Sequence, residues 1–331
     1  MDKLQRRSQH GGVSLELIQH IQTLLPVKQA ARTCVFSETW SHAWSTIPNL
    51  RFDQTLFSPT EGKKSDYKMF MDRTMSKYVR DNIPIESFDL KLDDMHSVSL
   101  IYEWIRTVAA RPKELSIHHQ SYESEYLLPG EIFSGKYLHT LSIKNSSARP
   151  KPLINCVSLR VLKLSCVKIS EDVLHTLFST CTLLEKIEVS NCIDLKTIKV
   201  RNLRYLQRLT LETSMPFDVL KIDDVPNLCL FYYHVVCVPM KIFNMAFLSS
   251  VTELSLHGVT IDVAFLDMIK FKLPFLEILD FNIMHRTLEK LDFTSSSLKR
   301  LTSNKLGKET DWHTSLCSKV TLFELQRLHN A

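Results

Sequence analysis

The chain has 331 residues, with 41 basic and 36 acidic side chains and a formal net charge of +5. This small positive excess argues against a nucleic-acid-binding protein, in which basic residues gather on one face. Only seven residues are glycine, and their positions form neither a G-x-G-x-x-G motif nor a Walker-type loop, so no nucleotide-binding site is expected.

Residues that could carry catalysis or bind a metal are not grouped in the sequence. The eight cysteines include no C-x-x-C pair, and no spacing of Cys and His fits a zinc site. The adjacent His118 and His119 would point to opposite faces of a strand and cannot chelate together. No G-x-S-x-G motif or Ser-His-Asp arrangement is evident. We therefore expect no metal, no cofactor and no enzyme activity.

The hydropathy pattern gives no sign of a membrane protein. The first residues lack the apolar run of a signal peptide. The longest uncharged apolar stretch, residues 225–240, is interrupted by Pro226, His234 and Pro239, and is too short to cross a bilayer. The sequence thus predicts reduced thiols, no membrane partner, and a location in the cytoplasm, the nucleus or both.

The first predicted element is an amphipathic helix within residues 13–27, VSLELIQHIQTLLPV, after a disordered stretch over residues 1–12. Ser14 is placed to cap the helix, and Pro26 to end it. Its apolar side chains fall on a single stripe, within an arc of about 120° on a helical wheel. They are Leu17, Ile18, Ile21, Leu24 and Leu25.

A second helical stretch is predicted over residues 28–44, with apolar residues on two opposite sides. Ala30, Ala31, Cys34 and Val35 form one side; Phe36, Trp40, Ala43 and Trp44 form the other. Two apolar sides indicate two packing partners, unless the Ser-Glu-Thr at 37–39 breaks the helix. A unit of this size is near the lower limit for folding alone, so it is expected to pack on a partner or on the rest of the chain.

These elements, followed by Ile-Pro-Asn-Leu-Arg-Phe-Asp at 47–53, resemble a plant F-box over residues 13–53. Two departures from the family pattern are Val13-Ser14 in place of Leu-Pro, and Glu38 in place of a basic residue. The resemblance implies a Skp-family adaptor bound by these helices, and a cullin and a RING subunit linked through it. It implies contact with the adaptor through Leu17, Ile18, Ile21, Leu24, Leu25, Pro26, Val27, Ala31, Val35 and Trp40.

A polar linker is predicted over residues 54–68, because Ser58-Pro59 and Glu61-Gly62 are turn signals. A connecting segment of helices and strand follows over residues 69–111. Within it we expect a helix over 69–80, an alternating strand over 85–92 and a helix over 101–110.

Beyond the connecting segment the chain repeats. The unit is L-x-x-L-x-L with aliphatic substitutions, called a repeat frame below. Successive frames start 21 to 26 residues apart, within the period of about 20–29 residues of leucine-rich repeats. A half-spaced frame over 195–200 lies between two strong ones. The frames start at residues 112, 138, 159, 184, 206, 228, 251, 276 and 298.

The repeats predict an irregular α/β arc over residues 112–303, with a parallel sheet on its concave face. The fold class is therefore α+β: a small all-α F-box followed by a solenoid. A helix near residues 171–177 is expected on the convex side, and Cys192 fills the turn position where asparagine is usual. Residues 304–331 are expected to be a C-terminal cap or tail, with a short helix over 322–328.

The concave face is predicted to bind a target protein, because its side chains carry both signs of charge. The residues assigned to it are Lys144, Lys163, Lys186, Glu188, Arg208, Glu212, Glu253, His257 and Asp280.

The expected function is that of the substrate-recognition subunit of an SCF-type (Skp-cullin-F-box) ubiquitin ligase. Two alternatives stay open. One is a repeat scaffold with a degenerate F-box. The other is a small-molecule, hormone-like sensor, which a basic pocket over the concave face would favour.

Overall fold

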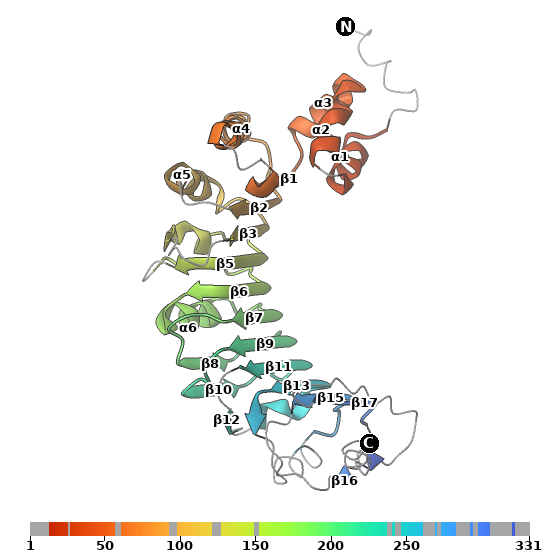
Figure 1. Ribbon diagram of the computed structural model, residues 1–331, viewed down its shortest axis with the longest axis vertical. Coiled ribbons are helices and arrows are strands. Elements are labelled where there is room, and N and C mark those ends of the chain that lie inside the picture. Colours follow the sequence, from red (N-terminus) through yellow and green to blue (C-terminus); the bar gives the residue numbers. More distant parts are fainter. Residues whose placement is uncertain are drawn as a thin grey trace.

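The computed structural model describes residues 13–25, 27–56, 61–92, 98–120, 127–148, 152–236, 240–241, 246–260, 269, 273–282, 292–293, 297–304 and 320–321. A unit of short helices is followed by a curved column of parallel strands (Figure 1). The predicted α+β class, with a helical unit ahead of a leucine-rich-repeat arc, is confirmed.

The helical unit packs three helices around a small core. The elements are α1 (Leu15–Leu24), α2 (Val27–Arg32), the 3-10 turn η1 (Thr33–Val35) and α3 (Glu38–Ser45). Ser14 caps α1 as predicted, since its hydroxyl accepts a hydrogen bond from the Leu17 amide. The helical stretch predicted over 28–44 is broken at Ser37, which is the alternative left open for residues 37–39: Ser37 is extended, and its hydroxyl accepts from the Trp40 amide and so starts α3.

Two glutamines of α1 connect the helices of this unit. The Gln22 side chain is buried, and its Nε2 donates to the Thr33 hydroxyl at 2.9 Å and to the Trp40 carbonyl at 3.1 Å. The Nε2 of Gln19 donates to the Thr46 carbonyl at 3.0 Å. These bonds satisfy polar groups that would otherwise be costly to bury, and they fix α1 against α3.

A twelve-stranded sheet forms the body of the described part of the chain, and its neighbouring strands run parallel. Its strand order follows the sequence, except that the short β4 (Leu127–Leu128) pairs beside β5. The other strands are β1 (Asn49–Asp53), β2 (Ser87–Leu92), β3 (Glu114–His119), β5 (Thr140–Ala148), β6 (Val161–Lys168), β7 (Lys186–Ser190), β9 (Arg208–Thr213), β11 (Leu230–Val235), β13 (Glu253–His257), β15 (Ile278–Asn282) and β17 (Arg300–Asn304).

The predicted frames account for these strands because alternate residues of each strand point into the core. Leu141 on β5 stands beside Leu162 on β6, and Leu162 beside Ile187 on β7; all three are buried. Stacked strands therefore form continuous apolar ladders that one strand could not bury alone. The frames at 112, 228 and 298, which match the L-x-x-L-x-L unit less well than the others, are confirmed as strands β3, β11 and β17.

The sheet starts well before the predicted boundary of the repeats at residue 112. Strand β1 pairs with β2, and β2 pairs with β3, in one register. Ile47 and Ile85 open two frames, IPNLRF and IESFDL, whose apolar residues are buried. The last residues of the predicted F-box, 49–53, are thus the first strand of the sheet.

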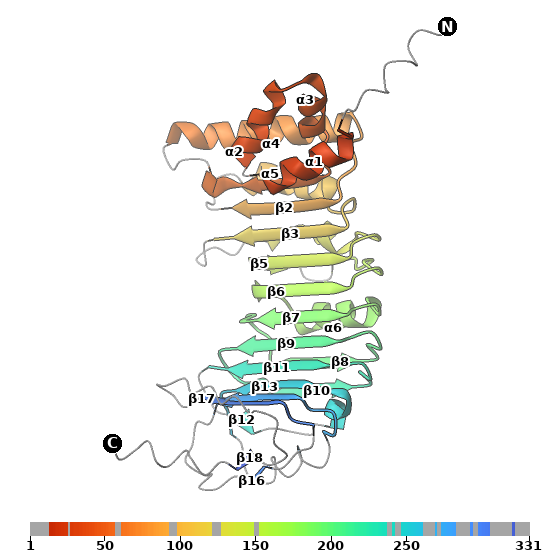
Figure 2. The same ribbon diagram turned by 90° about the vertical axis from the view of Figure 1, so that its right-hand side faces the viewer.

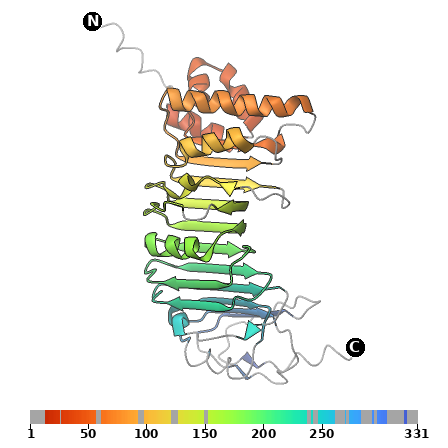
Figure 3. The same ribbon diagram turned by 90° about the vertical axis from the view of Figure 1, so that its left-hand side faces the viewer.

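Among the described elements, the helices α4 to α6 cover one face of the sheet, and the other face is open beyond α1–α3 (Figures 1 and 2). Helices α4 (Glu61–Arg80), α5 (Val98–Val108) and α6 (Glu171–Thr180) lie along one side of the column, as Figures 1 and 3 show. Figure 2 shows the opposite, concave face, with α1–α3 at one end of it. The predicted linker over 54–68 is wrong in part, because η2 (Gln54–Leu56) and the start of α4 lie within it. The helix α6 confirms the prediction near 171–177.

Short strands form a second layer in places. Strand β8 (Thr197–Arg201) pairs with β10 (Val219–Asp223) outside the main sheet, which explains the half-spaced frame. Other short pairs join β12 (Met240–Lys241) to β14 (Val259–Thr260), and β16 (Asp292–Phe293) to β18 (Val320–Thr321). Gly258 has a φ of +69°, and a Cβ there would overlap the Val235 carbonyl, so this turn requires glycine.

Further 3-10 turns are η4 (Gly130–Phe133) and η5 (Ala246–Ser250). No helix among the described residues is long and apolar enough to pass through a lipid bilayer. The predicted C-terminal helix over 322–328 lies outside the described residues, as does the predicted disordered stretch over 1–12.

Candidate functional site

The helical unit exposes apolar side chains that its own core does not use. Val35 is 83% exposed, and Leu24 is 71% exposed. Leu17 and Ala31 are also exposed, whereas Ile21, Leu25 and Trp40 are partly buried. These residues, predicted to contact an adaptor, are accessible on the folded unit.

Three of the predicted adaptor contacts are not exposed side chains of the described structure. Ile18 is buried in the core of the helical unit, so the prediction that it faces a partner is contradicted. The reason is that the buried positions of α1 are Ile18 and Gln22, one turn apart, rather than the whole apolar stripe. Pro26 and the side chain of Val27 lie outside the described residues.

Phe36 is an exposed aromatic residue that sequence reasoning did not assign to the adaptor surface. It is 69% exposed and its ring lies 5.5 Å from that of Trp40, in an edge-to-face arrangement. The helical phase applied over 28–44 placed Phe36 opposite Val35. The 3-10 turn η1 and the break at Ser37 end that helix, so the helical phase does not apply there.

The open face of the sheet carries the charged side chains predicted for target binding. All nine lie on strands of the main sheet, at positions that alternate with buried ones where burial is described. Several are already paired: the Glu188 carboxylate lies 2.6 Å from the Lys186 ammonium on its own strand, and 3.3 Å from the Lys163 ammonium on the neighbouring β6. Lys186 and Arg208 are partners in the register of β7 and β9, so two cations stand side by side.

An aromatic and histidine cluster marks the later strands of this face. The rings of Tyr232 and His257 are 5.6 Å apart, as are those of His234 and His257. The His257 Nε2 lies 3.4 Å from a carboxylate oxygen of Asp280, and the His234 Nδ1 lies 3.8 Å from Glu212. Burial lowers the pKa of His234, and the nearby His257 lowers it further. The sequence frames did not indicate this cluster.

The two adjacent histidines predicted to face opposite ways do so. His118 lies on the open side, 3.1 Å from the Ser142 hydroxyl. His119 is buried, and its Nδ1 lies 2.8 Å from the Ser146 hydroxyl. Within the part of the chain that the structure describes, no group of three or more His, Cys, Asp or Glu is arranged to hold a metal ion.

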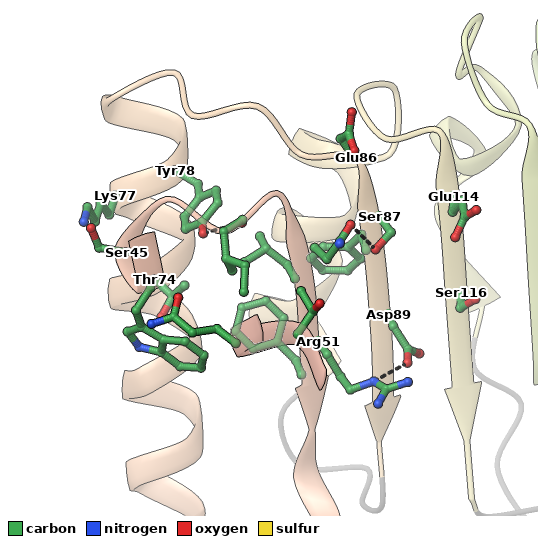
Figure 4. Close-up of a pocket in the computed structure, with 18 of the residues that line it drawn as sticks. Ser45, Arg51, Thr74, Lys77, Tyr78, Glu86, Ser87, Asp89, Glu114 and Ser116 are labelled. Atoms are coloured by element: carbon green, nitrogen blue, oxygen red, sulfur yellow. Dashed lines mark hydrogen bonds and ion pairs between the residues drawn. The ribbon is translucent and has the colours of Figure 1, made fainter. Parts of the chain in front are cut away.

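A pocket of about 900 Å³ lies where the helical unit meets the first strands, and is called the junction groove below. Its walls come from α1 and α3, from α4, and from β1, β2 and β3 (Figure 4). Four basic residues line it: Arg51, Arg73, Lys77 and Lys113. Three acidic residues also line it: Glu86, Asp89 and Glu114.

Comparison with known proteins places the repeats in a family. The family model described as "At1g61320/AtMIF1, LRR domain" matches residues 79–302, which is more than half of the chain. F-box/LRR-repeat protein At4g14103 of Arabidopsis thaliana is 27% identical over 225 residues, which cover 64% of this chain and 58% of the relative.

Two further relatives come from the same plant. F-box/LRR-repeat protein 13 is 27% identical over 212 residues, covering 62% of this chain and 47% of the relative. F-box/LRR-repeat protein 25 is 24% identical over 204 residues, covering 61% and 75%. Two other matches extend over 36% and 38% of the relative, and At4g14103 is covered to 58%, so the chain spans about half the length of the curated relatives it matches. The chain belongs to the plant F-box/leucine-rich-repeat protein family.

Proposed function

We propose that the chain is the target-recognition subunit of an SCF-type ubiquitin ligase, working in the cytoplasm or the nucleus. The helical unit α1–α3 binds a Skp-family adaptor, which links the chain to a cullin and a RING subunit. The open face of the sheet binds the target protein. The chain has no chemical step of its own in this role; it brings the target to the enzyme.

One observation carries the adaptor half of the proposal. Val35 and Phe36, which are consecutive in the sequence, are 83% and 69% exposed, whereas the buried apolar residues of the helical unit are Ile18, Ala30 and Ala43. Exposed apolar clusters on a small unit are typical of protein interfaces. The names of the relatives, which include F-box, give independent support.

The target half rests on the open face of the sheet. Figure 2 shows this face uncovered by helices below α1–α3, so a partner protein has access to it. Its mixed charges suit a protein surface, because charge pattern sets which partners are accepted. Lys186 and Arg208 are neighbours in the register of β7 and β9, and Lys186 is paired with Glu188 at 2.6 Å, so Arg208 is the cation that an acidic group on the target would meet at that point.

Co-expression with a Skp-family adaptor tests the proposal. The full chain should retain the adaptor through purification, and a form lacking residues 1–45 should not. The deletion ends at 45 because Ile47 and strand β1 belong to the core of the sheet. Failure of both folded forms to retain the adaptor would leave a repeat scaffold with a degenerate F-box as the better description.

A further inference from the structure

Strand β1 ends the main sheet, and one of its edges has no partner strand among the described residues. Among the described residues, β1 has β2 as its only neighbour in the strand order. The Pro48 carbonyl accepts from the amides of Glu86 and Ser87 at 2.8 and 3.3 Å. In a parallel ladder, alternate residues turn both backbone groups toward one neighbour, so Leu50 and Phe52 bond to β2.

The other residues of β1 therefore direct their backbone groups away from β2. The groups that point away from β2 are the amides and carbonyls of Asn49 and Arg51. Four consecutive residues of β1, from Asn49 to Phe52, line the junction groove. An open strand edge is a ready template for pairing with another extended chain.

The wall that α4 adds to the groove is cationic. Phe70, Arg73, Thr74, Lys77 and Tyr78 line it from one face of the helix, and Figure 4 shows the last three beside the first strands. Arg73 and Lys77 are one turn apart, and among the described residues neither has a carboxylate within salt-bridge distance. Asp81, one turn beyond Lys77, forms an ion pair with Arg80, whose Nε lies 2.8 Å from the Asp81 carboxylate.

The other charges of the groove are largely neutralised. Arg51 pairs with Asp89 at 3.0 Å, and Lys113 pairs with Glu86 at 3.2 Å. The α4 wall is thus the part of the groove where positive charge is left unpaired. Apolar surface is also available there, because Phe70 is 38% exposed and Trp44 is only partly buried.

We propose that the junction groove binds an extended acidic segment of a partner protein, which adds a strand to the free edge of β1. Main-chain hydrogen bonds to Asn49 and Arg51 hold the segment in register. Its carboxylates face Arg73 and Lys77, and an apolar side chain contacts Phe70. The chain's own first twelve residues do not suit this role, because Lys3, Arg6 and Arg7 outnumber Asp2.

A strand is favoured over a single small acid for two reasons. The groove follows four residues of β1, whereas a small ligand needs an enclosed site with a few converging polar groups. The two free cations lie about 5–6 Å apart along the helix, which matches successive acidic residues on one side of an extended peptide. The inference does not depend on adaptor binding by α1–α3.

A selection with a random library of short peptides displayed on phage tests the proposal on the full chain. Peptides rich in Asp and Glu should be enriched, and the synthetic peptides should bind about tenfold or more weakly to Arg73→Glu/Lys77→Glu. The matched control is Lys196→Glu/Arg204→Glu, which reverses two exposed charges outside the groove and should leave affinity unchanged.

A second measurement leaves the protein unaltered. Methylating alternate backbone nitrogens of a selected peptide should abolish binding for one set of positions and spare the other, because only one set faces β1. The proposal is overturned if neither set matters, if no peptide prefers the wild type over Arg73→Glu/Lys77→Glu, or if phenylacetate displaces the peptide as readily as an unlabelled copy does. That last result would point to a small-ligand site.

Discussion

The Tyr78 hydroxyl donates a hydrogen bond to the Ile47 carbonyl oxygen at 2.7 Å. Tyr78 is on α4, and Ile47 lies between α3 and β1, so this bond joins α4 to the point where the helical unit leads into the sheet. Both side chains are buried, and burial raises the pKa of Tyr78, which keeps its proton on the hydroxyl.

Tyr78→Phe should lower the free energy of unfolding by about 1–3 kcal/mol, because it leaves the Ile47 carbonyl buried without its donor. Urea unfolding followed by circular dichroism measures the loss. Tyr137→Phe is the matched control, since Tyr137 is mostly exposed and should tolerate the change. Equal stability of both variants would show that the bond does not hold the two parts together.

Much of the fold was predictable from the sequence, and the reasons are specific. The repeat frames predicted the strands correctly because apolar and polar residues alternate in them. Leu162 and Leu164 alternate with Lys163 and Ser165, which only a half-buried strand explains. The same signal was present at Ile47 and Ile85 but was assigned to other segments. The start of α4 was missed because its early residues are polar. Yet Tyr67, Met71, Met75 and Tyr78 are buried at helical spacing and are a readable stripe.

The candidate sites were less predictable than the strands. The junction groove brings Thr23, Trp44, Lys77 and Glu114 together from separate segments, and no local pattern relates them. Burial of Ile18 depends on how α1 meets α3, which the apolar stripe alone does not define. Long-range packing therefore decided which apolar residues stayed on the surface.

Stability should fall as the pH drops from 6.5 toward 4, in part because of His119. Burial lowers the pKa of His119 to about 4, against 6.5 when unfolded, so the unfolded chain takes up the proton first. The stabilisation that comes from keeping His119 neutral is fully present above pH 6.5. It is lost as the pH falls, and below pH 4 the loss in the free energy of unfolding is about 3 kcal/mol. Unfolding of wild type and His119→Asn across this range should show a shallower slope for the variant.

The exposed His139 provides the comparison for that experiment, since His139→Asn should keep the wild-type slope. Carboxylates also titrate in this range, but they contribute equally to both variants. Subtracting the free energy of unfolding of one variant from that of the other at each pH removes their contribution. Parallel curves for wild type and His119→Asn would contradict the account of His119.

Thiol reactivity should follow burial. Cys229 is exposed, whereas Cys156 and Cys181 are buried with their sulfurs 3.4 Å apart. Burial also raises the pKa of Cys192 to about 12, so little of it is thiolate at neutral pH. Among the cysteines that the structure describes, iodoacetamide should modify Cys229 first in the folded protein and these three only on unfolding, as peptide mass spectrometry would show. Early modification of Cys156 or Cys181 would mean that the repeat core opens readily.

Charge reversal on the open face should weaken binding of a target. Lys186→Glu/Arg208→Glu replaces the side-by-side cations on β7 and β9 by two anions and should reduce affinity for an identified target about tenfold or more. Arg201→Glu/Lys221→Glu on the small sheet of β8 and β10 reverses the same number of charges and should have little effect. Surface plasmon resonance at two salt concentrations would measure the affinity of each double variant for the target and compare the two. Equal affinities would place the target elsewhere.

The most direct test of the proposed ligase role is the affinity of the purified chain for a Skp-family adaptor. Val35→Glu/Phe36→Glu places charge on the exposed apolar pair of the helical unit without disturbing its buried core, and should weaken binding at least about tenfold in isothermal titration calorimetry. Leu153→Glu/Phe275→Glu, at exposed apolar residues of the repeats, should bind like wild type. If wild type and Val35→Glu/Phe36→Glu bind the adaptor equally, or if wild type does not bind it at all, the proposed role is contradicted.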